Sequence, residues 1–137
     1  MKKQLNILLT CAGGELIPQT IKFIRKSHKF NIKIVGVDLQ FDAIGKTFCD
    51  YFYQICKPKN SRKYIKEINR IAKKHNINLI IPTSDEESLC LAKNRNLIER
   101  KNLKITNNNF STLKIFSNKI STYKLLKQFG IKTPNFL

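Results

Sequence analysis

Several features that would point to a particular class of protein are missing from this chain. No run of about 18 apolar residues occurs, which excludes a membrane-spanning helix. The apolar run near the N-terminus breaks at residues 11–14, so we interpret it as a strand and not as a signal-peptide core. None of the four cysteines (Cys11, Cys49, Cys56 and Cys90) forms a C-x-x-C pair. We therefore expect a cytoplasmic protein with reduced, mostly buried thiols and no metal site.

Catalytic patterns are missing as well. The two histidines, His28 and His75, fall near the ends of expected helices, where we expect cationic side chains and not ligands. No Ser-His-Asp or Cys-His arrangement can be assembled from the sequence. The full G-x-G-x-x-G spacing of a dinucleotide-binding loop is also absent. The sequence therefore predicts no catalytic residue and no metal ligand.

Acidic residues are few. Nine acids stand against 26 bases, which gives a net charge of +17. This charge is typical of proteins that bind nucleic acid or acidic membranes. However, 21 of the cations are Lys and only five are Arg, the residue that reads bases by bidentate contacts. Lys, Asn and Ile all have A/T-rich codons and are all abundant, so we favour genomic bias over a functional basic patch. An acidic partner domain is the third interpretation.

The residues that are present suffice for one ordinary domain. The chain has 137 residues, 42% of them apolar, with nine Phe and four Tyr to fill a core. Apolar patterning predicts strands at 5–10, 32–38, 51–55, 79–81 and 103–105. It also predicts helices at 15–28, 111–116 and 119–129. Two further helices are expected, one that is capped by Ser61 and ends at about residue 75, and one that is capped by Thr83 or Ser84. Residues 39–50 are expected to form a loop. This alternation predicts an α/β fold, a Rossmann-like open parallel sheet with helices on both faces.

Two candidate ligand-binding segments lie where the first two strands end, the edge at which such sheets bind ligands. Gly13, Gly14 and Glu15 follow the first strand, where glycines permit close backbone approach and a helix start favours an anion. A tight strand-to-helix turn explains the glycines equally well. Asp38 ends the second strand, in the place where an acid binds ribose hydroxyls in dinucleotide-binding folds. The alternative is a loop Asp that caps its own turn.

A third candidate segment follows the fourth strand. Residues 83–87 combine two hydroxyls with three acids in an otherwise basic chain. We take Thr83, Ser84, Asp85 and Glu86 as candidate substrate-binding residues. Helix capping offers an alternative, because Ser or Thr followed three residues later by Glu86 or Glu87 forms a capping box.

These segments resemble ATP-grasp proteins of the carbamoyl-phosphate-synthase-large-subunit-like group. Residues 6–14 (NILLTCAGG) resemble the opening of these proteins, and 35–38 (VGVD) their second strand. Residues 48–53 resemble their ADxFY stretch. Residues 79–87 (LIIPTSDEE) resemble their DLIIPTxDEE segment, the most specific match. Residues 118–134 resemble DKxxxYxxLxxxGIPTP, although Asn118 replaces the usual Asp. The matches span the chain in the same order.

The resemblance implies a pre-ATP-grasp domain over residues 1–108 and a helical linker with the start of an ATP-grasp module over 109–137. The full-length enzyme would use ATP and Mg²⁺ to activate a carboxylate as an acyl phosphate and pass it to an amine or another nucleophile. The three candidate segments would contribute to the substrate site. Lys119 would contact an ATP phosphate, a role that suits a compact ammonium.

The resemblance also implies that most nucleotide ligands and all magnesium ligands lie beyond Leu137. We therefore expect no ligase activity from this chain alone. The expected partners are a small-molecule carboxylate and the ATP-grasp module, and a homodimer stays open. Apolar residues 136–137 resemble the start of another strand, and we expect an exposed apolar patch near Phe129 and Phe136. The alternatives are a free Rossmann-like domain that binds a nucleotide or metabolite at Gly13, Gly14 and Asp38, and a basic nucleic-acid-binding domain.

Overall fold

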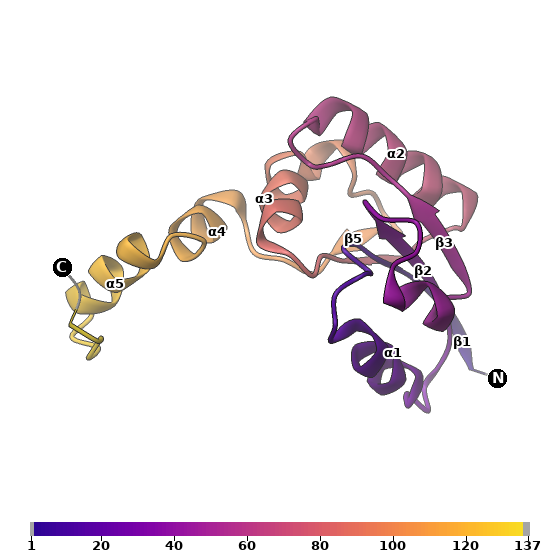
Figure 1. Ribbon diagram of the computed structural model, residues 1–137, viewed down its shortest axis with the longest axis horizontal. Coiled ribbons are helices and arrows are strands. Elements are labelled where there is room, and N and C mark those ends of the chain that lie inside the picture. Colours follow the sequence, from indigo (N-terminus) through magenta and orange to yellow (C-terminus); the bar gives the residue numbers. More distant parts are fainter. Residues whose placement is uncertain (1, 136–137) are drawn as a thin grey trace.

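A computed structural model describes residues 2–135 (Figure 1). Its centre is a five-stranded sheet with the strand order β3-β2-β1-β4-β5, and all paired strands run parallel. The strands are β1 (Lys3–Leu9), β2 (Phe30–Asp38), β3 (Tyr51–Gln54), β4 (Leu79–Ile81) and β5 (Lys104–Ile105). The expected Rossmann-like α/β fold is therefore confirmed.

The helices agree with the expected ones except at their ends. They are α1 (Ile17–Arg25), α2 (Ser61–Lys74), α3 (Asp85–Lys93), α4 (Phe110–Phe116) and α5 (Lys119–Gln128). Helix α1 begins two residues later than predicted, since no side chain caps its N-terminus, and Glu15 lies outside it. Helix α2 is capped by Asn60, whose side chain accepts a hydrogen bond from the Lys63 N–H, and not by Ser61. The predicted loop at 39–50 contains a 3₁₀ helix, η1 (Ile44–Phe48).

Both faces of the sheet are covered. On one face Leu8 packs in a cluster with Tyr64 and Ile68 of α2. On the other face Ile7 and Leu9 pack with Ile17 and Ile21 of α1. Consecutive residues of a strand point to opposite faces, so a strand covered on both sides must be apolar at nearly every position. This requirement explains the continuous apolar run that identified β1 in the sequence.

All four cysteines are free, and each is partly buried. Burial raises the pKa of the Cys49 thiol to about 11, and the nearby Asp50 carboxylate acts in the same direction. At neutral pH Cys49 is therefore a protonated packing residue.

His75, at the C-terminal end of α2, is not the cation that its position suggested. A hydrogen bond of 2.7 Å joins its Nε2 to the Tyr53 hydroxyl, and its ring lies 4.5 Å from that of Tyr51. Partial burial lowers the pKa of His75, and the positive charges of Lys74 and Lys33 lower it further. The fold thus favours the neutral imidazole, and the expected helix-end cation is wrong at this position.

This shift makes stability depend on pH. Because the folded chain resists protonation of His75, the unfolded chain takes up the proton first as the pH falls. The native free energy of unfolding should be intact above about pH 6.5, the unfolded pKa, and should decrease as the pH falls through the lower folded pKa. Urea unfolding of the native chain and of His75→Gln between pH 7.5 and 5 checks this. The free energy of unfolding of the native chain should fall more steeply with decreasing pH than that of His75→Gln. If the two fall in parallel, His75 does not cause the pH dependence.

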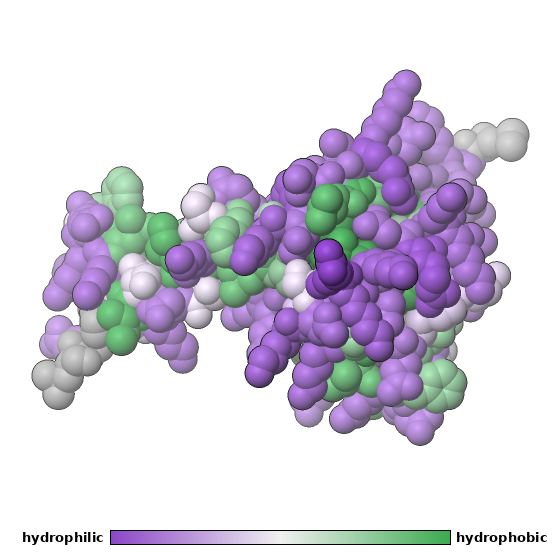
Figure 2. All heavy atoms as spheres, turned by 90° about the horizontal axis from the view of Figure 1, so that it is seen from above, coloured by the Kyte–Doolittle hydropathy of each residue, from purple (hydrophilic) through white to green (hydrophobic). Residues whose placement is uncertain are grey.

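Helices α4 and α5 extend away from the sheet as an arm (residues 110–131; Figure 1). Neither helix contains a buried residue. Phe116, Ile120, Phe129 and Ile131 are each more than half exposed, and Figure 2 shows apolar surface gathered along this arm. The exposed patch expected near Phe129 is confirmed, whereas Phe136 lies outside the described residues. No helix within residues 2–135 is long and apolar enough to cross a membrane.

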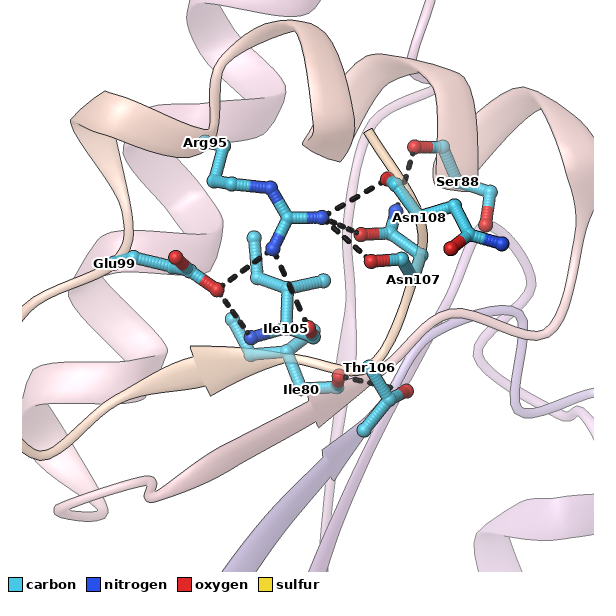
Figure 3. A network of polar contacts seen from close by, with 8 residues as sticks. All are labelled: Ile80, Ser88, Arg95, Glu99, Ile105, Thr106, Asn107 and Asn108. Carbon is cyan, nitrogen blue, oxygen red and sulfur yellow. Dashed lines mark hydrogen bonds and ion pairs between the residues drawn. The ribbon is translucent and has the colours of Figure 1, made fainter. Parts of the chain in front are cut away.

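Arg95 joins the end of α3 to the segment that leads into the arm (Figure 3). Its guanidinium donates to Glu99 Oε1 at 2.8 Å and to the carbonyls of Asn107 and Asn108 at 2.7 and 3.0 Å. It also donates to the Asn107 side-chain oxygen, and Glu99 Oε1 accepts from the Ile105 N–H at 2.9 Å. One residue thus fixes the end of β5 and the start of the arm.

Candidate functional site

The sheet order places a crevice between β1 and β4. Strand β2 lies on one side of β1, and β4 lies on the other. The connection that follows β1 and the one that follows β4 therefore lead away from each other at the carboxyl ends of these two strands, which leaves room for a crevice between them. A pocket of about 170 Å³ lies at this edge, and we call it the switch-point pocket. Its polar and thiol-bearing lining comprises Cys11, Asp38, Cys56, Lys57, Ser84, Glu86 and Glu87.

Asp38 closes the glycine turn from the side. Its Oδ2 accepts a hydrogen bond of 2.7 Å from the Gly13 N–H, and its Oδ1 accepts one of 2.9 Å from the Gln40 N–H. A Cβ on Gly13 would lie only 2.8 Å from Asp38 Oδ2, so a glycine is needed for this approach. The N–H group that could have bound an external anion is therefore occupied by a carboxylate of the chain itself. This geometry favours the self-capping interpretation of Asp38.

Of the turn after β1, Cys11 lines the pocket, and Gly13, Gly14 and Glu15 do not. The Gly14 N–H donates to the Cys11 carbonyl at 3.2 Å, which closes a tight turn. Cys11 itself has a left-handed backbone, with φ of 48°, where non-glycine residues are uncommon. Glu15 is exposed. The structure thus brings Asp38 to the pocket, with Gly13 behind it, and leaves Gly14 and Glu15 outside.

The segment after β4 both connects strands and caps a helix. The Thr83 hydroxyl donates to the Thr10 carbonyl at 2.6 Å, which ties the ends of β4 and β1 together. Ser84 caps α3: its hydroxyl accepts from the Glu87 N–H at 3.4 Å and donates to Glu87 Oε2 at 3.1 Å. Ser84 and Glu86 line the pocket, whereas Asp85 is exposed outside it.

Glu87 lines the pocket but was not among the candidate site residues. It is only 7% exposed. Burial raises the pKa of its carboxyl, although the hydroxyls of Thr10, Ser84 and Tyr64 oppose the rise by stabilising the charged form. The Thr10 and Tyr64 hydroxyls are buried and make no hydrogen bond of ordinary geometry. Helical spacing could have identified Glu87, because it lies four residues before the fully buried Leu91 and so shares its inward face.

The pocket is acidic in a strongly basic chain. Asp38, Glu86 and Glu87 face one lining cation, Lys57. Burial raises the pKa of the Cys11 thiol, and the charges of Glu87 and Asp38 raise it further. Cys11 is therefore a thiol at neutral pH and a poor nucleophile. The arrangement attracts a small cation and repels an anion.

Lys119 stands apart from this pocket. It is the first residue of α5 and is exposed, and Asn118 caps that helix by accepting a hydrogen bond of 2.9 Å from the Ser121 N–H. In Figure 1 this helix lies at the far end of the arm from the sheet. The structure does not bring Lys119 together with the other candidate residues.

The lining does not fit a magnesium nucleotide. The turn N–H that would receive a phosphate binds Asp38, and the carboxylates of Glu86 and Glu87 would repel one. Within residues 2–135, no group of three His, Cys, Asp or Glu side chains is placed to hold a metal ion. We therefore assign no reaction step on this chain to ATP or Mg²⁺.

Fold and pocket together define a Rossmann-like domain with a small pocket at its topological switch point. The chain belongs to the family of the PylC-like, N-terminal domain, whose model matches residues 7–106. The expected membership among pre-ATP-grasp domains is therefore confirmed. A sequence search of curated proteins finds no match.

Several solved structures share the fold. N5-carboxyaminoimidazole synthetase from Staphylococcus aureus, solved with ADP, superposes with a TM-score of 0.70 at 15% identity, over 100% of this chain and 33% of its own. L-amino acid ligase from Bacillus licheniformis gives 0.69 at 14%, over 98% and 32%. The biotin carboxylase domain of Hydrogenobacter thermophilus 2-oxoglutarate carboxylase, solved with MgADP and bicarbonate, gives 0.60 at 17%, over 93% and 28%. This chain thus spans about a third of each structure's length.

Proposed function

We propose that this chain is the substrate-binding domain of an ATP-dependent carboxylate ligase, and that its switch-point pocket receives the amine group of a substrate. The observation that carries the proposal is the convergence of Asp38, Glu86 and Glu87 on one small pocket of a chain with net charge +17. Family membership supports the ligase part, since the similar structures are ATP-grasp enzymes. The acidity of the pocket favours an amine over the carboxylate that the sequence alone suggested.

In this proposal the chain binds and orients its substrate. An ammonium group donates to Glu87, whose burial strengthens the attraction, and Glu86 at the pocket's rim adds a second negative charge. Ser84 holds the Glu87 carboxylate in place. ATP, held with Mg²⁺ by an ATP-grasp module, would transfer its terminal phosphoryl group to the carboxylate to give the acyl phosphate and release ADP. The exposed apolar side chains of the arm offer that module a docking surface, and the chain alone binds without ligating.

The alternative functions have less support. A nucleotide-binding module would need the Gly13 N–H and the Asp38 carboxylate, which bind each other. A nucleic-acid-binding domain would concentrate its cations on one face, whereas each of the five α-helices carries at least one Lys.

The proposal predicts selective binding of amines. Glycinamide, which has an ammonium but no carboxylate, should shift the backbone NMR signals of Cys11, Ser84 and Glu87 in the isotope-labelled chain. Glu87→Gln should weaken this binding about tenfold, because it removes the buried charge. Asp85→Asn, in the same acidic turn but outside the pocket, should leave binding unchanged. If acetate or AMP saturates the pocket while glycinamide does not, or if both variants behave alike, the proposal is wrong.

A further inference from the structure

A larger hollow, of about 560 Å³, lies at the opposite edge of the sheet, beside the amino ends of β4 and β5. Its walls come from the end of α2 and from two turns, residues 76–78 before β4 and residues 100–103 before β5. It shares no lining residue with the switch-point pocket. We call it the basic hollow.

The rim of the basic hollow is cationic and unpaired. Lys73, Arg100 and Lys101 line it, and no carboxylate does. Within residues 2–135 none of these three makes an ion pair, whereas Arg25 and Arg95 are each paired with an acid. Three unpaired cations around one hollow create a local field that favours an anion, and a guanidinium suits phosphate geometry in particular.

Buried hydrogen bonds hold one wall of the hollow rigid. The Asn6 side chain, only 8% exposed, donates to the carbonyls of His75 and Asn76 at 2.8 and 3.1 Å. The Asn6 N–H donates to Asn78 Oδ1 at 2.9 Å. In the other wall, Arg100 and Leu103 exchange two backbone hydrogen bonds of 3.2 and 3.1 Å. Both turns are therefore fixed before any ligand arrives, which lowers the entropic cost of binding.

The C-terminal end of α2 would ordinarily repel an anion through its free carbonyls. Here three of the last four, those of Ile71, Ala72 and Lys73, already accept a hydrogen bond. The carbonyl of Ile71 accepts from the His75 N–H at 3.0 Å, and that of Ala72 accepts from the Ile77 N–H at 2.9 Å. The repulsion is thereby reduced, and the lining cations dominate the local potential.

Ala72, Ile77 and Leu103 lie beneath the hollow but are buried, so the polar and cationic side chains form most of its accessible surface. We propose that the basic hollow binds a small phosphorylated molecule, with the phosphate held by Lys73, Arg100 and Lys101. Three cations match the double negative charge of a phosphate monoester better than the single charge of a carboxylate. This site is independent of the switch-point pocket and of its proposed function.

Phenyl phosphate is the probe, titrated into the isotope-labelled 137-residue chain at constant ionic strength and followed by NMR. Shifts should saturate and should be confined to the amides of residues 76–78 and 100–103. The double variant Arg100→Gln/Lys101→Gln should weaken binding about tenfold or more.

A matched double variant, Lys22→Gln/Lys26→Gln, removes the same charge from α1 and its C-cap and should leave binding unchanged. Circular dichroism of both variants checks that each retains its fold. If both double variants lose the same affinity for phenyl phosphate, the binding reflects only the net positive charge of the chain, and the proposal is wrong. Shifts that fail to saturate, or a short RNA that binds where phenyl phosphate does not, would also overturn it.

Discussion

Replacing Gly45 with alanine is expected to destabilise the chain by about 3 kcal/mol or more, enough to threaten folding. A Cβ at this position would lie 1.8 Å from the Ala12 carbonyl oxygen and 2.9 Å from its carbon. Ala12 cannot easily retreat, because it is fully buried and its N–H donates to the Val37 carbonyl at 3.0 Å. The added methyl group therefore has to displace either η1 or the turn after β1.

Urea unfolding monitored by circular dichroism measures this loss. Gly14→Ala is the matched control, since a Cβ there meets nothing closer than 3.6 Å. It should change the free energy of unfolding by less than about 0.5 kcal/mol. If Gly45→Ala is as stable as Gly14→Ala, then η1 does not press against the turn that carries Cys11. The prediction thus tests how the β2–β3 connection supports the switch-point pocket.

Gly45 also illustrates how far the sequence could predict the fold. The strands and helices followed from apolar runs and from helical spacing, because burial on both faces of a sheet leaves a periodic mark in the sequence. A close approach between two loops leaves no such mark. From the sequence, Gly45 is only one residue of the expected 39–50 loop, whereas in the structure it lets η1 contact the Ala12 backbone.

In the candidate site too, contacts between residues close in sequence could be predicted, whereas contacts between distant residues could not. The Ser84 cap and its Glu partner are local, three residues apart, and could be predicted from a capping box. The contact between Gly13 and Asp38 joins residues 25 apart, so it depends on the pairing of β1 with β2 and appears only in the structure. Lys57 reaches the pocket from the connection after β3, where no pattern marked it.

The second large effect is expected at Arg95. Replacing Arg95 with alanine should cost about 2–3 kcal/mol of unfolding free energy. The variant loses the ion pair with Glu99 and the bonds to the carbonyls of Asn107 and Asn108 (Figure 3). Arg95→Lys keeps the charge but not the planar fork, so it should recover only part of the loss. The matched control is Arg70→Ala, which should cost little, because Arg70 of α2 is exposed and makes no ion pair within residues 2–135.

The effect of Arg95→Ala should also depend on pH. Burial acts to raise the pKa of Glu99, but the Ile105 N–H and Arg95 outweigh it, and the net shift is downward. A lowered carboxyl pKa contributes stability that is present above the unfolded value of about 4.3 and is lost as the pH falls through the folded value. The gap between native chain and variant in urea unfolding should therefore be full at pH 7 and should narrow below about pH 4. If the difference in unfolding free energy between the native chain and Arg95→Ala stays constant with pH, Arg95 acts through its carbonyl contacts alone. If Arg95→Ala loses no more unfolding free energy than Arg70→Ala, Arg95 does not hold the arm to α3.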